Sequence, residues 1–124
     1  MKYEKAPDVE ERLKKIVKKL NQTHVDVTRV VCIRSYGSKS KAIARILGLP
    51  KIFQIALDCS SYYVIEVIAK KYDKLSEEEK DKILIHELLH IPKKFSGSLL
   101  PHKYFNKKID KKTVEELYKI LIIQ

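Results

Sequence analysis

The sequence predicts a single α+β domain over residues 1–124, with helices packed on a small, mostly antiparallel sheet of three strands. Three observations lead to this fold class. Four segments repeat their apolar residues at helical spacing, and three others are rich in β-branched and aromatic residues. The third observation is the length of the chain, because 124 residues with 44% hydrophobic content have room for one core but not for two.

The first two helices are predicted from their ends and their apolar stripes. Pro7 followed by acidic residues suits a helix start, and the apolar residues of 8–20 fall on one face. Ser38 can cap a second, short helix, and Gly48 followed by a proline marks its end. The stripes are Val9, Leu13, Ile16, Val17 and Leu20 in the first helix, and Ala42, Ile43, Ile46 and Leu47 in the second.

Three segments are predicted to be strands. Residues 25–33 form a nearly continuous apolar, β-branched run, which is typical of a strand near the centre of a sheet. Residues 52–57 and 62–69 are two further β-rich runs, and the segment 58–61 between them suits a hairpin turn. The sheet is therefore expected to be at least partly antiparallel.

Two more helices are predicted in the second half of the chain. Ser76 and Glu79 form the pattern of a capping box, and the apolar residues that follow continue the helix to about residue 91. Pro92 ends it, and the segment 92–109 is expected to be irregular. A last helix is predicted over 111–122.

The third helix ends in His86-Glu87-Leu88-Leu89-His90, which is the strongest functional signal in the chain. Two histidines at i and i+4 project from one face of a helix and can converge on one metal ion. Glu87 lies beside them, where its carboxylate can orient a metal-bound water and accept its proton as the water attacks a carbonyl. The motif therefore predicts Zn²⁺ as the cofactor, His86 and His90 as ligands, and Glu87 as the catalytic base.

A catalytic zinc site usually has three protein ligands, so a third ligand is expected elsewhere in the chain. His102 is the first choice, because it follows a glycine-containing loop long enough to fold back, whereas His24 lies far upstream. A carboxylate of the last helix is the alternative, from Asp110, Glu115 or Glu116. Ser96, Gly97, Tyr104 and Asn106 are candidates to contact the substrate or the groups around the ligands, and the tyrosine can stabilise an oxyanion.

Several short segments together carry a family resemblance. They are Tyr62-Tyr63-Val64-Ile65-Glu66-Val67, Lys74-Leu75-Ser76, His86-Glu87-Leu88-Leu89-His90-Ile91-Pro92, Phe95-Ser96-Gly97 and His102. Over about residues 30–105 the chain resembles the small HExxH metallopeptidases of archaea and phages, and more distantly the SprT-like minimal zincins. The resemblance implies a minimal-zincin core in which the strand before the active helix lies along the substrate cleft, where it can pair with an extended peptide.

The resemblance implies the same roles for His86, His90 and Glu87, and it supports His102 as the third ligand. The chain departs from the metzincin pattern, because the interval of twelve residues from His90 to His102 exceeds the six of that pattern and lacks its glycine. The geometry of that subfamily is therefore not expected. SprT-like proteins act on proteins attached to DNA, which suggests a substrate class only by analogy.

The chain is basic, with 26 Lys and Arg against 16 Asp and Glu and a formal charge of +10. The segment 91–109 has no acidic residue but contains Lys93, Lys94, Lys103, Lys107 and Lys108. This border favours a nucleic acid or another polyanion as a partner in addition to a peptide or protein substrate, although a well-solvated surface accounts for the same lysines.

The leading hypothesis is a zinc-dependent metallopeptidase. The alternatives are a metal-dependent nuclease and a basic nucleic-acid-binding module whose metal is structural. Glu87 favours the peptidase, because a carboxylate inside the motif is what peptide hydrolysis uses. A structural zinc would need four protein ligands, and no fourth is evident in the sequence.

Two cysteines, Cys32 and Cys59, are too few for a disulfide framework, so a reducing cytoplasm is expected. No stretch approaches 18 consecutive apolar residues, and the first residues lack the apolar region of a signal peptide. We therefore expect a cytoplasmic protein with no membrane partner. The sequence does not indicate the oligomeric state.

Overall fold

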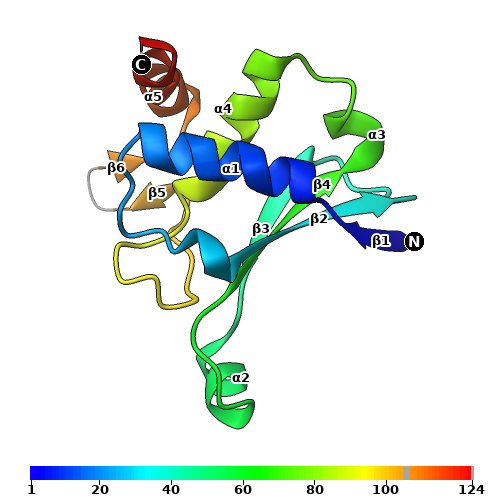
Figure 1. The fold of residues 1–124 in the computed structure, drawn as a ribbon, viewed down its shortest axis with the longest axis vertical. Coiled ribbons are helices and arrows are strands. Elements are labelled where there is room, and N and C mark those ends of the chain that lie inside the picture. The colour runs from blue at the N-terminus through cyan, green and yellow to red at the C-terminus, as the bar shows by residue number, and fades with distance from the viewer. Residues whose placement is uncertain (105–106, 124) are drawn as a thin grey trace.

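The computed structural model describes residues 1–104 and 107–123, and it confirms the α+β class (Figure 1). In the described residues the main sheet has four strands in the order β1 (Lys2–Lys5), β2 (Val30–Tyr36), β4 (Tyr63–Ile68) and β3 (Ala44–Gly48). β1 and β3 run antiparallel to their neighbours, whereas β2 and β4 pair in parallel. The expected three-stranded, mostly antiparallel sheet is therefore not confirmed. The centre is parallel because the chain between β2 and β4 first crosses to the outer side of β4.

Two neighbouring predictions are interchanged in the structure. The segment 38–47 was expected to be helical, but β3 occupies its second half; the segment 52–57 was expected to be a strand, but α2 (Lys51–Ala56) lies there. In β3 the partly buried Ala44, Ile46 and Gly48 alternate with the exposed Arg45 and Leu47, and pairing with β4 stabilises this alternating pattern instead of the helical stripe. The strand predicted from the β-rich composition of 52–57 does not form, because this segment pairs with none of the four strands of the main sheet.

The other helices agree more closely with the sequence. α1 (Pro7–Lys19) begins at Pro7 as predicted, and α4 (Glu77–Leu88) begins with a complete capping box. In that box Ser76 Oγ accepts from the backbone N–H of Glu79 at 3.1 Å, while the Glu79 carboxylate accepts from the N–H of Ser76 at 3.1 Å. The last helix, α5 (Lys111–Ile123), confirms the final prediction.

The remaining elements are short. A 3₁₀ turn, η1 (Val27–Arg29), replaces the first half of the strand expected at 25–33, because the Asp26 carboxylate accepts from the N–H of Thr28 at 3.0 Å. α3 (Ala69–Tyr72) follows β4, and β5 (Lys103–Tyr104) pairs with β6 (Lys107–Lys108). Among the described helices, none combines the length and apolar character needed to cross a bilayer.

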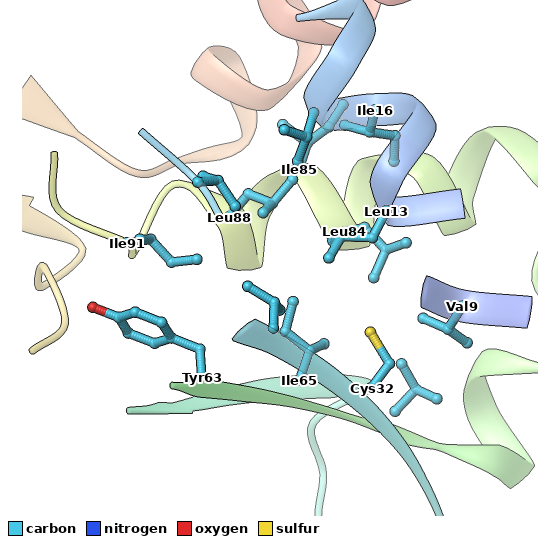
Figure 2. Close-up of a cluster of buried hydrophobic side chains, with 14 of the residues drawn as sticks. Val9, Leu13, Ile16, Cys32, Tyr63, Ile65, Leu84, Ile85, Leu88 and Ile91 are labelled. Atoms are coloured by element: carbon cyan, nitrogen blue, oxygen red, sulfur yellow. The ribbon is translucent and has the colours of Figure 1, made fainter. Parts of the chain in front are cut away.

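The core lies between one face of the sheet and the helices α1 and α4 (Figure 2). Each element contributes the apolar residues of its inner face, and the two helices also pack against each other. The labelled members are Val9, Leu13 and Ile16 from α1, Cys32 from β2, Tyr63 and Ile65 from β4, Leu84, Ile85 and Leu88 from α4, and Ile91. This packing fixes the position of α4, which carries the start of the histidine motif.

Candidate metal centre

α4 presents His86 and Glu87 because its opposite face is buried. Leu84, Ile85 and Leu88 are almost fully buried between the sheet and α1, so the helix cannot rotate about its axis without exposing them. His86 lies on the partly exposed side, and Glu87 lies deeper, with 7% of its surface exposed.

His90 lies just beyond the helix rather than within it. The expectation that the helix would run to about residue 91 is not confirmed, because α4 ends at Leu88. The following turn still keeps a helical course, since the N–H of Leu89 donates to the carbonyl of Ile85 at 3.1 Å. As a result the rings of His86 and His90 remain neighbours, with centroids 5.2 Å apart.

His102 is brought to these two rings by the loop 92–102. Its Nε2 atom lies 3.3 Å from Nε2 of His86, and one ring nitrogen from each of His86, His90 and His102 lies within 4.8 Å of the others. Two nitrogens bound to a tetrahedral zinc at its usual bond length lie about 3.3 Å apart. The three rings thus have the donor chemistry and the spacing that a metal ion requires.

The hydrogen bond of His90 leaves its second nitrogen available. Nδ1 lies 2.5 Å from the carbonyl oxygen of Leu100, which can only accept, so Nδ1 carries the proton and donates. Nε2 is then unprotonated and can bind a metal ion. Leu100 lies two residues before His102, so this hydrogen bond also links the ring of His90 to the loop that carries His102.

The loop that carries His102 is fixed by contacts that sequence reasoning missed. The Tyr63 hydroxyl accepts from the N–H of Gly97 at 2.9 Å and donates to the carbonyl of Ser98 at 2.7 Å. Gly48 and Gly97 lie so close that a Cβ on Gly48 would be 1.9 Å from the carbonyl oxygen of Gly97. A tyrosine in an apolar strand indicates that its hydroxyl needs a partner, but the sequence could not show which segment provides it.

The electrostatics of the centre favour a neutral, proton-accepting site. Burial raises the pKa of the Glu87 carboxyl to about 7. Burial also lowers the pKa of His86 below its usual value, and the neighbouring His90 and His102 lower it further. The lowered pKa of His86 favours the neutral form that a metal ligand needs.

The alternative third ligands lie outside the histidine cluster. Asp110 accepts from the N–H of Thr113 at 3.0 Å at the start of α5, and Glu115 forms an ion pair with Lys82 at 2.8 Å. Glu116 is exposed on α5, and His24 is part of the distant segment before η1. Tyr104 is in β5, directly after Lys103, while Asn106 lies outside the described residues.

A cleft of about 480 Å³ opens over the three histidines and Glu87. Its opposite wall is β3, one of the two edge strands of the main sheet, from which Ala44, Arg45 and Ile46 contribute. The expectation that the strand before the active helix lies along the cleft therefore needs correction. That strand, β4, is paired on both sides, whereas β3 pairs with β4 alone among the described residues.

A second hollow, of about 400 Å³, continues from His86 between α4 and α5. Its apolar lining comes from Ile43, Leu75, Ile83 and Val114. Charged residues stand beside them, namely Glu79, Lys82, Lys111 and Glu115. This hollow next to His86 can therefore accommodate an apolar group beside the three histidines.

A family model described as "Putative phage metallopeptidase" matches residues 1–122. The chain belongs to this family. The phage metallopeptidase match includes all three clustered histidines and Glu87, and it agrees with the resemblance carried by the motif. No curated protein and no solved structure matches the chain. Family membership and the histidine cluster together indicate a metal ion without identifying the element.

Proposed function

We propose that this chain is a zinc-dependent peptidase, with His86, His90 and His102 as the metal ligands and Glu87 as the general base. The observation that carries the proposal is the convergence of three ring nitrogens within 4.8 Å, next to a buried carboxylate. Three neutral imidazoles with one open position form a common ligand set of catalytic zinc.

The residues divide the chemistry between them. A bound zinc ion supplies a Lewis acid that polarises the scissile carbonyl and makes a water more acidic. Burial raises the pKa of Glu87, which makes its carboxylate a better proton acceptor. Glu87 takes the proton from the attacking water and delivers it to the leaving amine. His90 is held in its ligating tautomer by the carbonyl of Leu100.

The cleft supports an extended peptide as the substrate. Among the described residues β3 pairs with β4 alone, and three of its residues line the cleft, so its other edge can offer backbone donors and acceptors to a bound chain. A peptide bound along this edge passes the three histidines, and the apolar hollow beside His86 can accept one of its apolar side chains. Peptides with apolar residues near the scissile bond are therefore the first substrates to test.

Elemental analysis of the purified chain tests the metal site. We expect about one zinc per chain, and its loss in the His86→Ala and His102→Ala variants. His24→Ala is the matched control, because His24 lies outside the cluster and its loss should leave the zinc in place. Retention of zinc in His102→Ala would move the third ligand to another residue.

The Glu87→Gln variant tests the base. It should keep the zinc and lose peptidase activity by a factor of about 10²–10⁴, the usual contribution of a positioned acid or base. Glu116→Gln, an exposed glutamate on α5, serves as the control and should remain active. Full activity of Glu87→Gln would eliminate the proposed mechanism.

A metal-dependent nuclease is the second candidate, and one observation favours it. Lys103 and Lys108 face each other directly in the β5–β6 pair, next to His102, although like charges in that arrangement destabilise a strand pair. A phosphate backbone would relieve this repulsion. RNA or DNA hydrolysis that survives in Glu87→Gln but not in His86→Ala would support the nuclease, whereas metal-independent binding would support a nucleic-acid-binding module.

A further inference from the structure

α2 and the residue that follows it, 51–57, form a small apolar protrusion that we call the α2 knob. Ile52, Phe53, Ile55 and Leu57 each leave between 53% and 74% of their surface exposed. Single exposed apolar residues are common on proteins, but four large ones on one short segment form a patch. Figure 1 shows the knob at one end of the molecule's longest axis, at the tip between β3 and β4 and away from α1 and α5.

The knob buries the side chain of Gln54 and exposes its large apolar side chains. Gln54 is 5% exposed, and its side-chain amide donates to the carbonyl oxygens of Leu49 at 2.8 Å and Ser96 at 2.9 Å. This arrangement is the reverse of an ordinary surface helix. Because these bonds fix the orientation of α2, the exposed position of its apolar side chains is determined by the fold and is not the result of a loose end.

Lysines lie along one side of the knob. A hollow of about 720 Å³ beside α2 is lined by Lys51 and Lys94, together with Ile55 and the single acidic residue Asp58. Lys93 is exposed next to Lys94, and the whole chain carries a formal charge of +10. Contact between the knobs of two copies would bring the same lysines together, so the charge disfavours a second copy as the occupant and favours an anionic surface.

We propose that the α2 knob docks the protein onto an anionic phospholipid surface. Its apolar side chains enter the boundary between headgroups and acyl chains, while Lys51 and Lys94 contact the lipid phosphates. A convex knob suits a lipid surface, which deforms around it and needs no preformed cavity. The sequence predicted no membrane partner because it has no spanning segment, but surface docking does not require one.

Co-sedimentation with lipid vesicles tests this proposal on the full chain, independently of any enzymatic activity. Vesicles of phosphatidylcholine and phosphatidylglycerol should bind the protein at least tenfold more tightly than vesicles of phosphatidylcholine alone. The double variant Phe53→Ser, Ile55→Ser should bind at least tenfold more weakly. The matched control is Ile122→Ser, Ile123→Ser on α5, where the two side chains are also highly exposed and the affinity should stay within a factor of two.

A lysine variant separates the charge from the apolar contact. Lys51→Ala, Lys94→Ala should weaken binding to the anionic vesicles by about thirtyfold, which corresponds to two lysines at roughly 1 kcal/mol each. Circular dichroism checks that each variant is folded. Absence of binding to anionic vesicles, or equal binding by wild type and knob variant, overturns the proposal. So does a dimer in sedimentation velocity that the knob variant dissociates, because the knob would then be a contact between copies.

Discussion

Replacing Tyr63 by phenylalanine should loosen the loop that carries His102. Tyr63 is fully buried, and its hydroxyl links β4 to the backbone of Gly97 and Ser98. Gly97 is buried, so its N–H would lose its partner without access to water, whereas the exposed Ser98 can be hydrated. An unsatisfied buried donor costs about 1–3 kcal/mol, so we expect the free energy of unfolding to fall by about 2 kcal/mol.

Urea denaturation in the presence of a chelator measures this loss without a contribution from bound metal. With a typical urea dependence for a small domain, about 2 kcal/mol lowers the unfolding midpoint by roughly 1 M. Zinc affinity, measured by competition with a chelating dye, should fall by about tenfold, because the loop no longer holds His102 in place. Tyr62→Phe is the matched control, since its ring is 38% exposed. A loss below 0.5 kcal/mol in Tyr63→Phe, or an equal loss in the control, would refute the reasoning.

Three further predictions follow from the described contacts. Gly97→Ala should destabilise the fold by about 3 kcal/mol in urea denaturation, because φ is +96° and the new Cβ would lie 2.4 Å from the backbone oxygen of Leu49. Gly37→Ala should cost less, because φ is +81° but the new Cβ would meet Met1 only at an ordinary contact distance of 3.9 Å; equal losses would exclude the clash as the cause. Burial raises the pKa of the Cys32 thiol to about 12, whereas Cys59 is only partly buried. Ellman's reagent at pH 8 should therefore label Cys59 quickly and Cys32 only after unfolding. Fast labelling of both thiols would contradict the burial of Cys32. Arg34 donates to both carboxylate oxygens of Asp8 and lowers the pKa of that carboxyl below its usual 3.8. The ion pair therefore stabilises the fold above that pH, and this stabilisation is lost as the pH falls through the lowered pKa. Below about pH 4 the urea midpoint of Asp8→Asn should decline less than that of the wild type, and parallel declines would argue against a stabilising ion pair.

The sequence determined the features that depend on residues close together in the chain. α1 begins where Pro7 and the acidic residues predicted it, and the capping box of Ser76 and Glu79 starts α4. The spacing of His86 and His90 also needs only one helical course, which the turn after Leu88 continues. Helix caps and the 3.6-residue period involve residues only a few positions apart, so the helices they define can be predicted without the tertiary structure.

The tertiary structure decided whatever depends on segments far apart in the chain. Whether 44–48 becomes a strand is decided by β4, which pairs with it, and whether 51–56 becomes a helix is decided by the absence of a strand partner in the main sheet. The position of His102 beside His86 depends on Tyr63, Gly48 and Gly97, which lie 15 to 49 residues apart from one another in the chain. Such contacts depend on packing and hydrogen bonding in three dimensions, so a pattern of residues that are close together in the sequence does not predict them.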